Sequence, residues 1–156
     1  MSIAARRAAH RVLERHSGLV RTLPVPIVRM AEADTWEIEY EELDVVEGVA
    51  IWLPNIRRML INDQLPPPRR RGVIAHELGH HERDDPTSIQ FAPVHLVNPF
   101  GTWLHSRAER GAWEVAAHIL VPIDLLDDLI HATVDDIARA CDVPPGLVVL
   151  ALGEPW

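Results

Sequence analysis

The residues with the clearest chemical potential lie in the segment IAHELGHHERDD, positions 74–85, which carries His76, Glu77 and His80 in the pattern H-E-x-x-H. Histidines four residues apart lie one helical turn apart on the same face, so both rings can point at one ion. Catalytic zinc sites combine three protein ligands with one water, and imidazole is a common ligand. A carboxylate beside the first histidine can take a proton from that water and later pass it to a leaving amine. The motif therefore predicts zinc-dependent hydrolysis with Glu77 as the general base.

A third metal ligand must come from outside the motif, and the helical segment SRAERGAWEVAAHILVP, residues 106–122, offers Glu109 and Glu114. Glu109 shares a helix face with Ala112 and Ala116, whose small side chains allow close packing on the motif helix. Glu114 is turned away from that face by about 140° at 3.6 residues per turn. This geometry predicts Glu109 as the third ligand and keeps Glu114 as the alternative.

Strands that can support these helices are indicated by alternating polarity. In TWEIEYEEL, residues 35–43, apolar and acidic residues alternate with the period of two that is typical of a strand with one solvated face. Two further strand candidates, GVAIWLP and RRMLIND, are separated by a turn. We therefore expect a small antiparallel sheet. The strand that carries Leu60 and Ile61 is a candidate for pairing with an extended substrate, as sheet edges do.

The remaining segments are predicted to be mostly helical. Apolar residues recur every three or four positions over residues 2–17, and several short helices follow Pro122. We predict an α+β, zincin-like fold, in which a small antiparallel sheet packs against the HExxH helix and a second, glutamate-bearing helix, with extra C-terminal helices. The chain is expected to form a single domain over 1–156, with an N-terminal helix in 1–20 and a C-terminal helical part in 122–156.

Composition limits the classes of function. The chain has 156 residues and a net charge of −8, which argues against direct binding of a nucleic-acid backbone. Its one cysteine, Cys141, cannot form an internal disulfide, which fits a reducing compartment. The sequence has no stretch of 18 apolar residues, the length that a membrane-spanning helix needs. Arginines interrupt the N-terminal segment, so it lacks the apolar core of a signal peptide. We therefore expect a cytoplasmic protein with no membrane partner.

Several segments, in their order, resemble the ImmA/IrrE family of metallopeptidases. They are LPVPIVRMA, the hairpin that leads into LPPPRRRGVIAHELGH, then AERGAWEVAAHILVP and VDDIARACDVPPGLVVLAL, and they cover most of residues 20–150. The resemblance implies that His76, His80 and Glu109 bind Zn²⁺. It implies that Glu77 is the base. Family members are commonly carried by phages and mobile elements and are thought to relieve repression by cleaving or antagonising a transcriptional repressor, which implies such a repressor as the protein substrate.

One position departs from the family pattern. The family often has an acidic or amide residue four positions after the glutamate ligand, where it can orient a ligand histidine, and this chain has Trp113. This departure keeps open an alternative function, in which a zinc-bound module binds a regulator without cutting it, as an antirepressor or antitoxin-like partner. A toxin that harms its host by proteolysis is a weaker alternative.

Other residues are candidates for lesser roles. His95 or His105 could stabilise the oxyanion that forms at a peptide carbonyl. The arginines at 69–71 are expected to form a solvated helix entry or to pair with the glutamates of 36–42, with an acidic partner as the alternative. His16 is expected at the surface because arginines surround it. The C-terminal segment 134–152 has the spacing of a helix-turn-helix core, but its aspartates oppose phosphate binding and favour a packing role.

Overall fold

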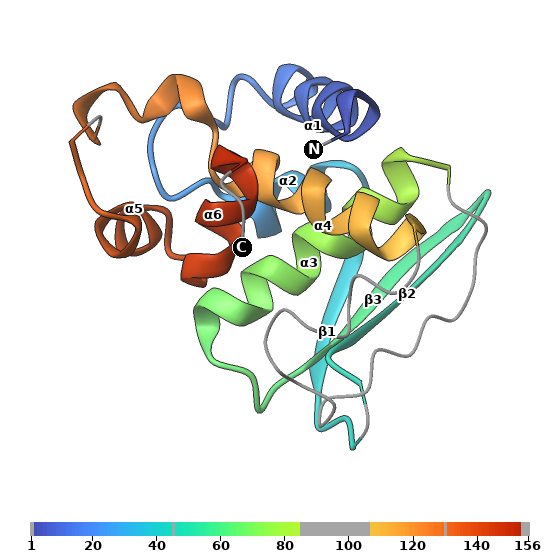
Figure 1. The fold of residues 1–156 in the computed structure, drawn as a ribbon. Helices are drawn as coiled ribbons and strands as arrows, with labels where there is room; N and C mark the ends of the chain where they lie inside the picture. Colours follow the sequence, from blue (N-terminus) through green and yellow to red (C-terminus); the bar gives the residue numbers. More distant parts are fainter. Residues whose placement is uncertain (1, 45, 85–106, 130, 154–156) are drawn as a thin grey trace.

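A computed structural model of the chain describes residues 2–44, 46–84, 107–129 and 131–153. In Figure 1, α3 runs through the middle of the molecule, with the sheet on one side and α1 and α4 on the other, and α5 and α6 lie at the end away from the sheet. The fold is α+β, as predicted. The elements in chain order are α1 (Ile3–Arg15), α2 (Ile27–Ala33), β1 (Glu37–Glu41), β2 (Gly48–Leu53), β3 (Ile56–Asn62), α3 (Pro67–Glu82), α4 (Arg107–Leu120), the 3-10 turns Ile123–Leu125 and Asp127–Leu129, α5 (Val134–Cys141) and α6 (Pro145–Leu152).

The sheet is mixed, so the prediction of an antiparallel sheet is wrong for one of its two pairings. The strand order is β1-β3-β2, with β1 parallel and β2 antiparallel to β3. Between β1 and β2 the chain passes across the end of β3, where Asn62 Nδ2 donates hydrogen bonds to the carbonyls of Leu43 and Val46. This connection carries the chain from one edge of the sheet to the other, so β1 and β2 cannot form a hairpin.

The central position of β3 also corrects a prediction about substrate. Leu60 and Ile61 belong to β3, which has hydrogen-bonded neighbours on both sides. The backbone of a central strand is already paired, so it has no free edge to offer an extended peptide. The prediction that this strand pairs with a substrate is therefore wrong.

The core forms where the sheet and α1 cover α3 and α4. From β3, Met59 and Ile61 point inward and are fully buried. From α1, a stripe of small residues is buried, and α1 packs along α4. Among the described residues, no helix has the length and hydropathy that a membrane crossing requires.

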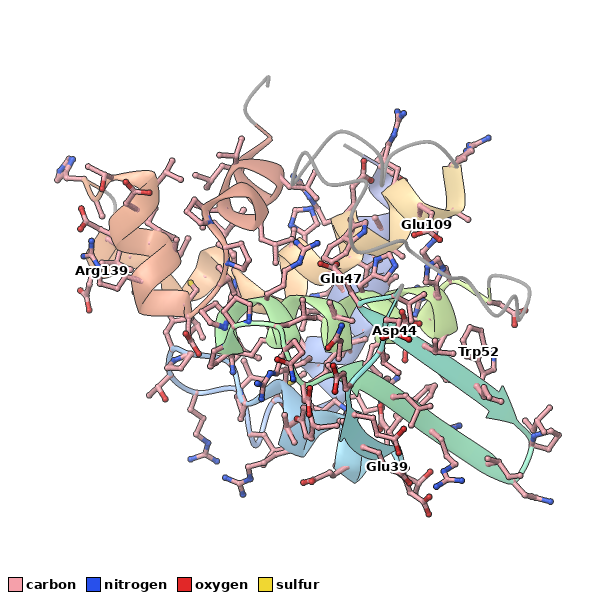
Figure 2. All side chains as sticks on the ribbon, turned by 90° about the horizontal axis from the view of Figure 1, so that it is seen from below. Glu39, Asp44, Glu47, Trp52, Glu109 and Arg139 are labelled. Carbon is pink, nitrogen blue, oxygen red and sulfur yellow. The ribbon has the colours of Figure 1, made fainter. Side chains whose placement is uncertain are left out.

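The C-terminal helices pack by their apolar faces. Ile137, Ala138 and Cys141 of α5 are buried, as predicted for a packing role. Helix α5 begins with a capping box, in which the Thr133 hydroxyl accepts from the Asp136 backbone N–H and the Asp136 carboxylate accepts from the Thr133 N–H. Figure 2 shows Arg139 of α5 at the opposite end of the molecule from Glu109. Helix α5 therefore lies far from the predicted metal ligands, whereas α6 packs against α4.

Candidate metal centre

Helix α3 presents all three motif residues from its buried C-terminal half. The helix begins after Pro66, with prolines at its first positions, where the missing N–H groups cost no helical hydrogen bond. His76, Glu77 and His80 are each less than 8% exposed. A polar group that is buried to this extent needs a partner. The partner of both histidines is a carboxylate on α4.

Glu109 of α4 faces both histidines. Its Oε2 lies 3.2 Å from His76 Nε2 and its Oε1 lies 3.2 Å from His80 Nε2, while the two Nε2 atoms are 3.1 Å apart. Ligand atoms at about 2.0–2.1 Å from one tetrahedral ion would lie roughly 3.3 Å from each other. The two imidazole nitrogens and the Glu109 carboxylate thus form a donor set whose chemistry fits Zn²⁺, and each nitrogen lies at a compatible distance from one of the two carboxylate oxygens.

Glu114, the alternative ligand, lies elsewhere. Its Oε2 accepts a hydrogen bond from the Ser2 backbone N–H at 2.9 Å, where Ser2 caps the start of α1. Glu114 is therefore on the face of α4 that packs against α1, as the angle of about 140° from Glu109 predicts.

A close approach of the two helices brings Glu109 over the motif. A Cβ atom added to Gly79 would lie 2.7 Å from the Ala112 carbonyl oxygen and 3.1 Å from its Cα. Only a glycine at this position lets the backbones of α3 and α4 approach so closely. Ala112 is three residues after Glu109, so this contact fixes the height at which the Glu109 carboxylate meets the two rings.

The electrostatics favour the ligand forms of these groups. Burial, helped by the charges of His80 and Arg69, lowers the pKa of His76 to about 4, so its imidazole is neutral near pH 7. Burial acts to raise the pKa of Glu109, but hydrogen bonds with His76 and His80 outweigh it and lower that pKa to about 2. A metal ligand must be a neutral imidazole or an ionised carboxylate, so both groups are ready to bind.

Glu77 has an environment suited to proton transfer. Its complete burial, reinforced by the charge of Glu109, raises its pKa to about 7, and the charge of His80 opposes this rise. A general base works best when its pKa lies near the working pH. A cation in the site would lower the pKa of Glu77 and favour its ionised form.

Trp113 occupies the position where the family often has an acidic or amide residue. Its ring stacks on that of His76, with centroids 4.2 Å apart and an interplanar angle of 28°. The Arg69 guanidinium lies over the Trp113 ring at 5.2 Å from its centroid and pairs with the buried carboxylate of Glu47. The sequence shows that Trp113 stands four positions after Glu109, but it did not predict either contact.

The arginines at 69–71 hold the start of α3 in place by contacts within the chain. The prediction that they form a solvated start of the helix or pair with the glutamates of 36–42 is wrong. Arg70 donates to the carbonyls of Leu65 and Asp63, and Arg71 donates to those of Val25 and Asp142. The strand glutamates Glu37 and Glu39 instead pair with Arg58 of the neighbouring β3. These contacts fasten the start of α3 to the segments around it.

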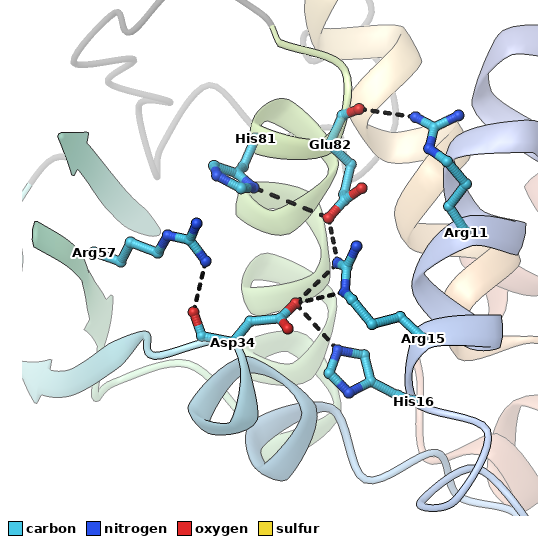
Figure 3. Close-up of polar contacts among 7 residues, drawn as sticks. All are labelled: Arg11, Arg15, His16, Asp34, Arg57, His81 and Glu82. Atoms are coloured by element: carbon cyan, nitrogen blue, oxygen red, sulfur yellow. Dashed lines mark hydrogen bonds and ion pairs between the residues drawn. The ribbon is translucent and has the colours of Figure 1, made fainter. Parts of the chain in front are cut away.

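The end of α3 is held by a second polar cluster, shown in Figure 3. Arg15 pairs with both Asp34 and Glu82, and Arg57 donates to the Asp34 carbonyl at 2.7 Å. His16 Nε2 lies 3.1 Å from Asp34 Oδ2, and His16 is buried, which corrects its predicted surface position. The cluster ties α1, α2, β3 and α3 together beside the metal-ligand candidates.

His81 points away from those candidates, because one residue along a helix turns the side chain by about 100° from His80. Its ring makes edge contacts with Trp36 and Trp52, at centroid distances of 5.3 Å and 5.7 Å. His95 and His105, the candidates for oxyanion stabilisation, lie outside the described residues.

Two imidazoles from one turn of a helix and a carboxylate from a second helix define a candidate mononuclear metal centre on an α+β scaffold. The chain belongs to the Peptidase_M78 family, described as the IrrE N-terminal-like domain, whose family model matches residues 27–152. The predicted resemblance to the ImmA/IrrE family is thereby confirmed. Membership indicates a metallopeptidase-type enzyme that acts on protein substrates. No match was found among curated proteins.

Proposed function

We propose that the protein is a zinc-dependent endopeptidase, with Zn²⁺ bound by His76, His80 and Glu109 and with Glu77 as the general base. The observation that carries this proposal is the convergence of three side chains from two helices: the two imidazole Nε2 atoms lie 3.1 Å apart, and each lies 3.2 Å from one oxygen of the Glu109 carboxylate. Family membership supports the same chemistry.

Each side chain has a distinct part in the proposed reaction. When bound, Zn²⁺ supplies Lewis-acid polarisation of the scissile carbonyl and of the attacking water. Glu77 accepts a proton from that water at its carboxylate and then donates it to the nitrogen of the leaving amine. The close contact at Gly79 keeps Glu109 over the histidines throughout.

We further propose that the substrate is a transcriptional repressor, encountered inside the cell. This part of the proposal depends on the resemblance to ImmA/IrrE proteins, while the peptidase family supports a protein substrate in general. The lone buried Cys141 is consistent with a reducing compartment.

The test compares the wild-type chain with Glu77→Gln, each incubated with the product of a repressor gene found next to its own gene. We expect Glu77→Gln to keep its zinc, measured by elemental analysis, and to produce no repressor fragments. The matched control is Glu14→Gln, because the Glu14 side chain is 74% exposed on α1, and it should cleave at the wild-type rate. Cleavage by Glu77→Gln at the wild-type rate would refute the role of the base. Relief of repression that persists in Glu77→Gln without fragments would favour the non-cleaving binding module.

A further inference from the structure

His76 differs from most metal-ligand histidines in the surroundings of its second ring nitrogen. Its Nδ1 is buried and has no hydrogen-bond partner among the described residues. In most zinc sites that nitrogen donates to a carboxylate, a carbonyl or a water, which fixes the orientation of the ring. Among the described residues, the contacts that can orient His76 are therefore ones other than a hydrogen bond at Nδ1.

The contact that the structure offers is an aromatic face. Trp113 and His76 are both about 5% exposed, and their rings stack at 4.2 Å with 28° between their planes. Stacked rings resist rotation because turning one of them would open a gap or a clash against the other. Trp113 is also four residues after Glu109, so one face of α4 supplies both the carboxylate and the surface against which His76 lies.

Trp113 is itself held in place. Arg69 lies over its ring at 5.2 Å, and Glu47 accepts from Arg69 Nε at 3.0 Å and from Nη2 at 2.6 Å. Two parallel charge-assisted hydrogen bonds fix the plane of a guanidinium. Gly72 packs beside the same ring, because a Cβ atom there would be in ordinary van der Waals contact with Trp113 at 3.7 Å.

We propose that Trp113, fixed by the Arg69–Glu47 pair, is a positioning residue that orients the His76 ring for metal binding by stacking, in place of a hydrogen-bond acceptor. This inference rests on the proposed metal site. It also explains how the chain can dispense with the acidic or amide residue that the family often has at this position.

The test measures Zn²⁺ affinity of the full chain by competition with a chromogenic chelator, and the absorption bands of the Co²⁺-loaded protein. Trp113→Leu keeps an apolar side chain but removes the aromatic face, so we expect about 10-fold weaker Zn²⁺ binding, at the lower end of what loss of a ligand's partner costs. Its Co²⁺ bands should also change in position and intensity. Trp113→Phe, which keeps a ring, should recover most of the affinity and the wild-type bands.

A control separates orientation from general destabilisation. Ile137→Ala removes buried volume from α5, far from the ligands, and should lower the melting temperature while leaving Zn²⁺ affinity and the Co²⁺ bands unchanged. The double variant Glu47→Leu, Arg69→Met removes both members of the buried pair without leaving either charge alone. We expect it to shift the Co²⁺ bands in the same direction as Trp113→Leu.

The outcomes distinguish this inference from the proposed function. Failure of the wild-type chain to bind Zn²⁺ would overturn both. If the wild type binds Zn²⁺ and Trp113→Leu binds it equally well with unchanged Co²⁺ bands, the positioning role alone is overturned. The same holds if Ile137→Ala reproduces the changes of Trp113→Leu.

Discussion

Helix α4 carries two glutamates five residues apart, and they do different work on opposite faces of the helix. Glu109 faces α3, where it meets two imidazole nitrogens at 3.2 Å. Glu114 faces α1, where it accepts one backbone N–H at 2.9 Å. Glu114 is buried and the Glu109 side chain is 20% exposed, but exposure alone does not identify the task of either residue. Their partners do.

The partner of Glu114 identifies its task as structural. In an ordinary capping box, a glutamate three residues into a helix accepts from the backbone N–H of the residue that caps it. Here the carboxylate that accepts from Ser2 comes from another helix, so Glu114 completes the cap of α1 and joins α1 to α4. The Glu109 carboxylate is instead directed at two imidazole nitrogens, both potential ligands of a cation.

The largest expected effect is the loss of metal binding in Glu109→Ala. Removing a ligand should weaken Zn²⁺ binding by more than the roughly 10–100-fold that loss of an outer partner costs. Glu114→Ala should bind Zn²⁺ as the wild type does. Isothermal titration of each full-length variant with Zn²⁺ measures the difference, and equal losses in the two variants would show that the two faces of α4 are not distinct in function.

Gly79→Ala should push α4, and with it Glu109, away from the two histidines of α3. The added methyl would meet the Ala112 carbonyl oxygen at 2.7 Å, so α3 and α4 must separate, at a cost of about 1–3 kcal/mol in the free energy of unfolding. Zn²⁺ binding should weaken as Glu109 withdraws. Urea denaturation and metal titration measure the two effects. Gly18→Ala is the control, because no atom lies within 4 Å of the added Cβ, and it should change neither.

Glu114→Leu tests the opposite face of α4. The Ser2 N–H loses its acceptor, and the free energy of unfolding should fall by about 1–2 kcal/mol. The metal site should be untouched, so the affinity for Zn²⁺ should stay at the wild-type value. Thermal unfolding followed by circular dichroism checks the stability, and an unchanged melting temperature would contradict the proposed link between α1 and α4.

Thr133→Ala provides a reference for a cap that is made within one helix. Thr133 caps α5 through its hydroxyl, and its loss should cost about 1 kcal/mol of stability. Because α5 is remote from α4, the effects of Thr133→Ala and Glu114→Leu should add in the double variant. A non-additive double variant would mean that the two ends of the molecule are coupled.

The smallest expected effect is a pH dependence of the stability that the α5 cap provides. Hydrogen bonds from Thr133 and Arg139 lower the pKa of Asp136 below its ordinary value. A carboxyl group with a lowered folded-state pKa contributes stability above its unfolded-state pKa, and this contribution is lost as the pH falls through the folded-state pKa. The stability difference between wild type and Thr133→Ala should therefore shrink in acid. Melting temperatures of the two proteins measured across an acidic pH series would check this.

Local periodicity was sufficient for the parts of the site that lie on single helices. The spacing of His76 and His80 and the angle between Glu109 and Glu114 depend only on 3.6 residues per turn, and the structure agrees with both. Local periodicity could not predict contacts between residues that are distant in sequence. Glu47 and Arg69 are 22 residues apart, and no local pattern marks them as partners.

The parallel pairing of β1 is a second example of what the sequence pattern could not supply. Alternation identified the strand. Its neighbour depends on where the chain goes after Glu41, and there the Asn62 side chain at the end of β3 donates to the carbonyls of Leu43 and Val46. His16 was misplaced for a similar reason, because its partner Asp34 lies just after α2. Tertiary contacts overrode the surface position that its arginine neighbours suggested.

Helix α1 has a practical consequence. The family match begins at residue 27, so α1 falls outside it. Yet α1 covers one side of α4, supplies the donor for Glu114 and, through Arg15, holds the end of α3. A fragment trimmed to the matched span would uncover apolar surface beside α3 and α4 and would leave a buried carboxylate without its donor. A fragment purified for enzymology should therefore keep Ser2 and α1.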